Sequence, residues 1–290
     1  MGIIEHCFSV DVEDWYQVEN LSSVISRSTW DKRERRVVRN MDRLLGIFDE
    51  ANVKVTCFIL GKVAREFPEL VKKIADKGHE VASHGEDHLS LYSHNPETFR
   101  STIDSLKKYL EDVSGQQVIG YRAPNFTITK ETWWALDILA ECGYLYDSSV
   151  FPFKRKRYGV KDAPIDPYKI SLTNGLTIAE FPPTVINLGI KTIPIAGGGY
   201  FRLYPTSFMN WAIKRLEKNH RVLCFYIHPW EIDPGQPKVS GIPFLEKRMH
   251  YLNLNTTEKK LKKVFKKYSF RSYGDHFREK EEFLRINKFL

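Results

Sequence analysis

Short apolar runs alternate along this chain with segments whose apolar residues recur at helical spacing, and this order constrains the fold most strongly. The apolar runs lie at 7–10, 53–60, 79–83, 118–121, 176–181 and 222–227, and the helical segments at 37–51, 68–77, 96–110, 130–142 and 205–219. Strands that alternate with helices of about 10–15 residues are typical of parallel βα units. Because each run is apolar throughout, we expect a sheet covered by helices.

The sequence therefore predicts an α/β fold, either a barrel or an open doubly wound sheet. Segments 148–173 and 184–204 interrupt the alternation, are rich in Pro and Gly, and are expected to form long loops over the core. An α/β barrel of about 250 residues is usually a single unit. We therefore expect one domain over 1–254, with 255–290 as a basic helical extension that packs on it or trails from it.

The basic charge of the chain is concentrated at its C-terminal end. The net charge is +8, and residues 255–290 contain eleven Lys or Arg against five Asp or Glu. Such a segment is usually a solvated helix face, and in some proteins it contacts nucleic acid or an anionic membrane. It lacks the interleaved aromatic residues of single-strand binders. We expect no nucleic-acid partner, with peripheral membrane contact as an alternative use of the segment.

Sorting signals and cysteine pairs are absent from the sequence. Residues 1–6 have neither the basic nor the apolar region of a secretory signal, and no apolar stretch approaches the roughly 18 residues of a membrane span. The four cysteines form no CxxC pair, which disfavours a disulfide framework or a thiolate zinc site. These features predict a reduced, cytoplasmic protein.

Polar residues follow the apolar runs at the points where the runs end. They are Asp11, Glu13 and Asp14 after the first run, His84 and His88 after the third, Arg122 after the fourth, Asp147 after 144–146, Glu180 near the end of the fifth, and His228 after the last. The carboxyl ends of parallel strands form the ligand-binding face of α/β proteins. We therefore expect these side chains to form one site.

The spacing of His84 and His88 indicates a metal site. Four residues apart, the two imidazoles would share one face of a helical turn, about 6 Å apart. Two imidazoles and a carboxylate are a common catalytic metal set that leaves positions open for water and substrate. Zn²⁺ fits these ligands best, and Fe²⁺, Co²⁺ or Ni²⁺ would also bind.

The remaining polar residues suit the proton transfers of a metal-assisted hydrolase. Among Asp11, Glu13 and Asp14, one carboxylate can bind the metal while another accepts a proton from water. His228 is a candidate general acid for a leaving amine. Arg122 could orient the catalytic carboxylate or hold substrate. The aromatic candidates for stacking on substrate, or for ordinary packing, are Trp230, Tyr200, Tyr204 and Trp15.

Four motifs in this order resemble those of the polysaccharide deacetylase family, the NodB-homology carbohydrate esterases, over about residues 5–235. They are SVDVEDW at 9–15, SHGEDH at 83–88, RAPNF at 122–126 and FYIHPW at 225–230. The second motif has Gly85 where the family has a hydroxyl residue, and the third has Asn125 inserted before Phe126. The DVED sequence resembles a divergent branch that includes exopolysaccharide-locus deacetylases, a Helicobacter peptidoglycan deacetylase and metal-independent allantoinases.

The resemblance implies a distorted (β/α) barrel of about seven strands that removes the acetyl group of an N-acetylhexosamine. It implies Asp11 as base and His84 and His88 as metal ligands, with Glu13 or Asp14 as the third ligand. The backbone N–H of Asn125 or Phe126 would hold the oxyanion, and His228 would protonate the amine. In the family an acidic residue tunes this histidine, a role that Asp147 or Glu180 could fill.

The expected substrate is an N-acetylated sugar in a glycan, a lipid-linked intermediate or a nucleotide sugar. Without an export signal in the sequence, a cytoplasmic biosynthetic precursor is favoured over finished cell wall. Two other functions stay open. One is an allantoinase-like amide hydrolase that works without metal, which the two histidines disfavour. The other is an inactive carbohydrate-binding relative, which the intact set of polar residues disfavours.

Overall fold

The computed structural model describes residues 4–153, 158–189 and 191–287. The first three residues of the N-terminal segment lie outside this range, as do short parts of the two segments expected to be long loops. No helix among the described residues is both long and apolar enough to cross a membrane.

A mostly parallel sheet forms the centre of the molecule, in the order β10-β1-β2-β3-β4-β5-β7-β6-β12. Its strands are β1 (Glu5–Val12), β2 (Thr56–Ile59), β3 (Glu80–Ser83), β4 (Gly120–Tyr121), β5 (Tyr146–Asp147), β6 (Tyr168–Ser171), β7 (Thr177–Glu180), β10 (Cys224–Ile227), β11 (Ser269–Arg271), which pairs with β1 off this path, and β12 (Ile286–Asn287). From β10 through β7 all neighbouring strands are parallel, whereas β6 is antiparallel to β7. The predicted α/β architecture is confirmed.

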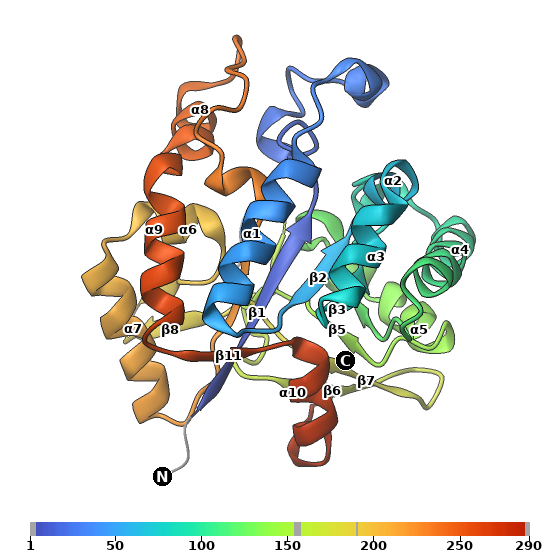
Figure 1. The fold of residues 1–290 in the computed structure, drawn as a ribbon. Coiled ribbons are helices and arrows are strands. Elements are labelled where there is room, and N and C mark those ends of the chain that lie inside the picture. Colours follow the sequence, from blue (N-terminus) through green and yellow to red (C-terminus); the bar gives the residue numbers. More distant parts are fainter. Residues whose placement is uncertain (1–3, 154–157, 190, 288–290) are drawn as a thin grey trace.

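Helices cover the outside of this sheet (Figure 1). They are α1 (Val37–Ala51), α2 (Gly61–Glu66), α3 (Pro68–Asp76), α4 (Pro96–Ser114), α5 (Trp134–Glu141), α6 (Gly198–Leu203), α7 (Thr206–Lys218), α8 (Phe244–Tyr251), α9 (Leu254–Phe265) and α10 (Tyr273–Lys280). Capping residues in the sequence determine where a helix begins and ends, as α4 illustrates. The Asn95 side chain caps the start of α4, and Gly115 ends it in the left-handed conformation.

The two ends of the parallel run approach each other without forming a strand pair. The chain that leaves β7 reaches β10 through Thr184, whose N–H donates to the Cys224 carbonyl at 3.2 Å. The Cys224 N–H in turn donates to Thr184 Oγ1 at 2.7 Å. These bonds bring β7 and β10 together, so the strands curve into an incomplete barrel.

Both segments expected to be long loops contain regular structure, and that expectation is wrong in this respect. Segment 148–173 contains β6, and segment 184–204 contains the antiparallel pair β8 (Val185–Leu188) and β9 (Lys191–Pro194), followed by α6. Pro and Gly mark turns, but they say little about the four-residue strands that fit between turns. Such short strands leave no periodic signal of their own.

The described part of the basic segment, 255–287, is built into the body of the molecule. Figure 1 shows α9 beside α1, while β11 pairs with β1 and β12 pairs with β6. The expected division at 254/255 therefore does not separate two bodies. Lys260 Nζ donates to the carbonyls of Phe201 and Tyr204 at 2.6 Å each, so part of the basic charge has a structural partner.

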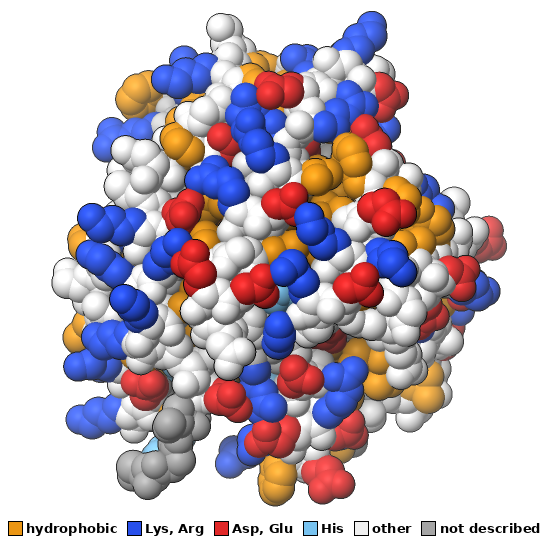
Figure 2. Space-filling view, in the orientation of Figure 1, with side chains coloured by type: hydrophobic (Ala, Val, Ile, Leu, Met, Phe, Trp, Pro, Cys, Tyr) orange, Lys and Arg blue, Asp and Glu red, His pale blue; other side chains and the backbone are white. Residues whose placement is uncertain are grey.

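Acidic and basic side chains are mixed over much of this face of the molecule. Figure 2 shows Lys and Arg interspersed with Asp and Glu over the centre, with Lys and Arg more frequent on the left, where α7 and α9 lie. Lys262 of α9 pairs with Glu50 of α1 at 2.8 Å. Exposed pairs of this kind contribute about 0–1 kcal/mol each.

Candidate active site

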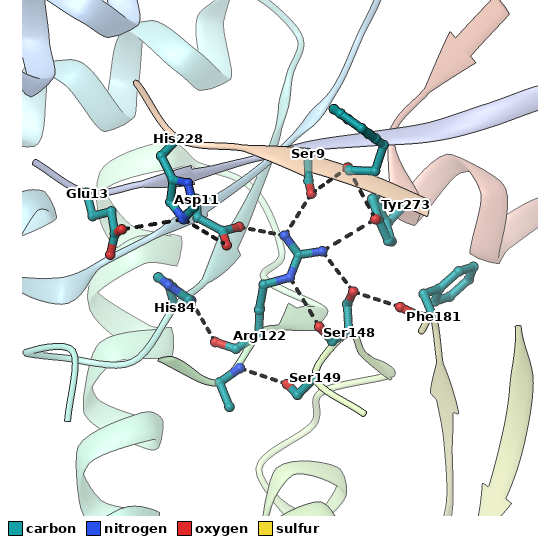
Figure 3. Close-up of polar contacts among 12 residues, drawn as sticks. Ser9, Asp11, Glu13, His84, Arg122, Ser148, Ser149, Phe181, His228 and Tyr273 are labelled. Atoms are coloured by element: carbon teal, nitrogen blue, oxygen red, sulfur yellow. Dashed lines mark hydrogen bonds and ion pairs between the residues drawn. The ribbon is translucent and has the colours of Figure 1, made fainter. Parts of the chain in front are cut away.

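The polar strand ends meet on one face of the sheet (Figure 3). Asp11 lies near the end of β1 and Glu13 just beyond it, while His84, Arg122 and His228 directly follow β3, β4 and β10. Parallel strands place their carboxyl ends on the same side, which explains the convergence. Asp11, Glu13, His84 and Arg122 are at most 2% exposed, whereas the His228 side chain is 19% exposed. The site is therefore largely buried and highly charged.

Glu13, His84 and His88 form the one group of three metal-capable side chains found among the described residues. Their ligand atoms all lie within 4.8 Å of one another. His84 Nδ1 lies 2.9 Å from the Arg122 carbonyl oxygen, a contact that fixes the ring and leaves Nε2 for a metal. Burial lowers the pKa of His84 to about 4, so this imidazole is neutral at pH 7, as a ligand must be.

Glu13 supplies the anionic member of this group. Burial alone would raise its pKa, but the neighbouring imidazoles of His88, His228 and His84 lower it to about 2. His88 Nε2 lies 2.9 Å from Glu13 Oε2 without hydrogen-bond alignment, so this buried oxygen has no hydrogen-bond donor within the described part of the chain. A buried, ionised oxygen between two imidazoles is a fitting place for a divalent cation, and the donor set fits Zn²⁺.

A tight loop, rather than the expected helical turn, brings the two histidines together. The ring centroids of His84 and His88 are 5.6 Å apart, yet the residues between them are not helical. Gly85 and His88 have φ values of +73° and +58°, in the left-handed region. The Arg27 guanidinium holds the loop by donating to the His88 carbonyl at 2.8 Å. The four-residue spacing predicted correctly that the two imidazoles lie together, but the helical turn expected between them is wrong.

Asp14 is not placed to be the third metal ligand. Its Oδ1 accepts the N–H of Trp15 at 2.8 Å, and its Oδ2 accepts the N–H groups of Arg36 and Val37 at 2.7 and 3.0 Å. The carboxylate thus satisfies backbone donors at the start of α1, where the helix dipole favours negative charge. This geometry removes the Asp14 alternative and leaves Glu13.

Arg122 orients the candidate base Asp11. Its Nη1 donates to Asp11 Oδ1 at 2.5 Å and to Ser9 Oγ at 2.8 Å, and its Nη2 donates to Ser148 Oγ at 2.8 Å (Figure 3). The guanidinium also lies over the ring of Phe58, 4.1 Å from its centroid. Arg122 is completely buried, so it positions the carboxylate and does not meet substrate. Asp11 keeps its second oxygen, Oδ2, toward the site.

His228 takes its acidic partner from the same turn of the chain, not from β5 or β7. Its Nδ1 lies 2.7 Å from Glu231 Oε1, and its Nε2 lies 3.9 Å from Asp11 Oδ2 and 3.5 Å from Glu13 Oε1. Burial alone would lower the pKa of His228, but the Glu231 hydrogen bond and the three carboxylate charges raise it to about 9. His228 is therefore a cation at neutral pH and can donate a proton.

A buried ion pair holds Glu231 in place. Arg202 Nε donates to Glu231 Oε2 at 2.7 Å, and both side chains are at most 2% exposed. A Cβ on Gly198 would lie 2.0 Å from this carboxylate, so the residue must be glycine for the two to fit. Gly198 therefore allows the close approach of Glu231.

Asp147 and Glu180, the two acids first considered for tuning His228, pair with each other instead. Asp147 Oδ1 accepts the Ser149 hydroxyl at 2.6 Å, and Glu180 Oε1 accepts the Val150 N–H at 3.1 Å. Burial raises the pKa of both carboxyls, and the Asp147 charge raises that of Glu180 further. The pair fixes the segment after β5, where Ser148 contacts Arg122, and both acids lie outside the reacting groups.

Replacing Glu180 by glutamine is expected to stabilise the protein at alkaline pH. Because the pKa of Glu180 is higher in the folded than in the unfolded state, the wild type is most stable below the usual Glu pKa of about 4.3 and loses stability as pH rises above it. Glutamine mimics the protonated acid and does not titrate. Thermal melts of both proteins from pH 5 to 9 test this, and a pH-independent difference in Tm would contradict it.

The other expected binding residues divide between the site and the core. Asn125 and Phe126 form a turn with φ values of +57° and +54°. The Phe126 N–H already donates to the Ala123 carbonyl at 3.1 Å, which favours the Asn125 N–H as the oxyanion donor. Such strained positions are frequent at functional sites.

Two of the proposed stacking residues are packed in the interior. Trp230 is 4% exposed and stacks on His228 and His250, with centroids 5.3 and 4.5 Å away, so it supports His228 rather than meeting a sugar. Trp15 is buried, and its Nε1 donates to the Glu34 carbonyl. Tyr200 and Tyr204 are half-buried and stack on each other, with 6.1 Å between centroids.

Comparison with known families divides the chain into two parts. Residues 25–146 match the polysaccharide deacetylase family, and residues 148–278 match a domain of unknown function, DUF3473. The division runs through the end of β5, inside the central sheet. The two matches therefore share one folded body and one site, because His84 and Arg122 lie in the first match and His228 in the second, while Asp11 precedes both.

Two curated relatives match parts of the chain. The peptidoglycan deacetylase-like protein FGM2 of Gibberella zeae is 34% identical over 110 residues, which is 37% of this chain and 32% of that protein. The peptidoglycan-N-acetylglucosamine deacetylase of Bacillus cereus is 34% identical over 73 residues, 25% of this chain and 26% of that protein. The matched part is thus at most about a third of each relative's length.

Solved structures share the fold over nearly the whole chain. A crystal structure from Mycobacterium smegmatis, assigned to the polysaccharide deacetylases, has a TM-score of 0.66 at 21% identity and covers 99% of this chain and 94% of its own. Puue allantoinase has a TM-score of 0.62 at 14% identity, over 95% of this chain and 89% of its own. The likeness to these structures shows the shared fold, and the family match shows that the chain contains a polysaccharide deacetylase domain over residues 25–146.

Proposed function

We propose that this protein is a metal-dependent hydrolase that removes the acetyl group from an N-acetylhexosamine in a glycan, a lipid-linked intermediate or a nucleotide sugar. One observation carries the proposal: the Glu13–His84–His88 group lies beside a base held by Arg122 and an acid held by Glu231. Metal-assisted amide hydrolysis uses a metal, a base and an acid within reach of one carbonyl. The family match supports the same reaction class.

The side chains divide the proton transfers between them. A divalent cation bound to Glu13, His84 and His88 would polarise the acetyl carbonyl and lower the pKa of water. Asp11 Oδ2 faces His228 and is the acceptor for the proton of the attacking water. The Asn125 N–H, on the turn with positive φ values, would hold the oxyanion. His228 Nε2, protonated at neutral pH, donates its proton to the departing amine.

Acetate release from purified protein tests this proposal. The full chain is supplied with Zn²⁺ or Co²⁺ and incubated with N-acetylglucosamine oligomers of increasing length and with UDP-N-acetylglucosamine. We expect acetate and a free amine in equal amounts, with no release after chelation. Release from the oligomers alone would assign a glycan, whereas release from the nucleotide sugar alone would assign a precursor. No release from any N-acetylhexosamine would contradict the proposal.

Two further measurements would favour other functions. Ring opening of allantoin by metal-free protein would support an allantoinase-like enzyme, a reading that the shared fold keeps in view. Glycan binding without turnover, unchanged in Asp11→Asn, would support a carbohydrate-binding protein. The cytoplasmic location and the membrane contact of segment 255–290 remain predictions, which cell fractionation and sedimentation with anionic liposomes test.

A further inference from the structure

The C-terminal segment enters the sheet directly beneath the candidate active site. β11 pairs in parallel with the first half of β1, in the register Glu5↔Ser269 to Cys7↔Arg271. β2 pairs with the second half of β1, from Ser9 to Val12. β11 thus lies beside the N-terminal half of β1, on the same edge as β2. The chain that follows β11 therefore enters the barrel at the N-terminal ends of the strands, opposite the face that carries the metal-capable group.

The start of α10 is fitted closely against the lower ends of β2 and β3. The Tyr273 N–H donates to Thr56 Oγ1 at 2.7 Å, and the Gly274 N–H donates to Glu80 Oε2 at 2.8 Å. A Cβ on Gly274 would lie 2.3 Å from Glu80 Oε1, so only glycine permits this approach. These bonds fix the position of Tyr273, whose side chain is completely buried inside the barrel.

The hydroxyl of Tyr273 reaches the guanidinium that holds the candidate base. Arg122 Nη2 lies 3.4 Å from Tyr273 Oη, which also lies 3.4 Å from the Phe225 carbonyl oxygen (Figure 3). Ser9 Oγ donates to the same carbonyl at 3.1 Å and accepts from Arg122 Nη1 at 2.8 Å. Tyr273, Ser9 and Phe225 thus form a floor under Arg122, on the side away from the site.

We propose that Tyr273 is a positioning residue for the reaction, because it holds Arg122, which in turn orients Asp11. The C-terminal part of the DUF3473 region, with β11 and α10, holds Tyr273 in this place. This inference rests on the proposed function for its kinetic consequence. Arg122 Nη1 is shared between Ser9 and Asp11, so a shift of the guanidinium changes the direction in which Asp11 Oδ2 points. Misplacement of a catalytic group by a fraction of an ångström slows a reaction without weakening substrate binding.

The test compares Tyr273→Phe with Tyr146→Phe. Tyr146 is a matched control because it belongs to the same buried cluster and its ring is stacked on Tyr273, with 6.3 Å between centroids. Its hydroxyl, however, donates to Glu80 and does not contact Arg122. We expect Tyr273→Phe to lower kcat about fivefold, the effect of losing one ordinary hydrogen bond, with KM unchanged. Tyr146→Phe should lower Tm and leave kcat unchanged.

Crystal structures of both variants separate this inference from the proposed function. In Tyr273→Phe we expect the Arg122 guanidinium and the Asp11 carboxylate to move relative to the wild type, and in Tyr146→Phe to stay in place. Equal kcat values for the two variants, or an unmoved Arg122–Asp11 pair in Tyr273→Phe, would overturn the role of Tyr273. If the wild type releases no acetate, the proposed function fails, and the structures alone decide whether Tyr273 positions Arg122.

Discussion

Replacing Glu13 by glutamine is expected to abolish metal binding and activity, whereas replacing the neighbouring Asp14 by asparagine is expected to preserve both. Each substitution is nearly isosteric and removes one negative charge. Glu13 is the anionic member of the three-residue group, whereas Asp14 accepts three backbone N–H groups around the start of α1. Loss of a direct ligand should cost more than the roughly 10–100-fold in metal affinity that loss of an outer partner costs.

Calorimetric titration of the metal-free proteins with Zn²⁺ measures this difference. Asp14→Asn should bind Zn²⁺ like the wild type, because the Asp14 side chain contacts backbone N–H groups and lies outside the metal-capable group. The reverse pattern, with Zn²⁺ binding lost in Asp14→Asn and kept in Glu13→Gln, would show that the metal group has been assigned to the wrong carboxylate.

Replacing His228 by glutamine is expected to lower kcat by about 10²–10⁴-fold, the usual contribution of a general acid. Zn²⁺ affinity should be unchanged, because His228 lies outside the Glu13–His84–His88 group. Steady-state kinetics at pH 7 measure the loss. A variant that keeps most of the wild-type kcat would exclude His228 as the proton donor and would leave the amine to be protonated by another group.

The alkaline limb of the pH profile tests the partner of His228. Because the pKa of His228 is raised to about 9, kcat should fall as pH rises through that region and the imidazolium loses its proton. Replacing Glu231 by glutamine removes the hydrogen-bonded charge, so the limb should move to lower pH by about one to three units. An unmoved limb in Glu231→Gln would assign the titration to a different group.

The sequence was sufficient for the parts of the site that follow from local patterns. Continuous apolar runs located the strands, and the parallel arrangement required their polar ends to meet on one face. That reasoning placed Asp11, Glu13, His84, Arg122 and His228 together, as the structure does. The spacing of the histidines was informative even though the loop between them, with positive φ at Gly85, is not helical.

The residues that hold these side chains in place could not be predicted from local sequence patterns. Asp147 and Glu180 end strands as clearly as Asp11 does, but the pairing of β5 with β7 puts them next to each other, and their side chains interact with each other. Glu231 lies only three residues beyond His228, and a single helical turn brings two residues at this spacing together. This spacing was the one sequence feature that could have identified Glu231 as the partner of His228. Tyr273 gives no signal, because its place depends on how β11 and α10 pack beneath the barrel.

Acetate release as a function of metal loading tests the central claim most directly. Metal-free protein would be titrated with Zn²⁺, and acetate release from the best N-acetylhexosamine substrate measured at each ratio of metal to chain. The Glu13–His84–His88 group predicts no release without metal and a rise to a plateau at one Zn²⁺ per chain. Full activity in metal-free protein, unchanged by added Zn²⁺, would contradict the account.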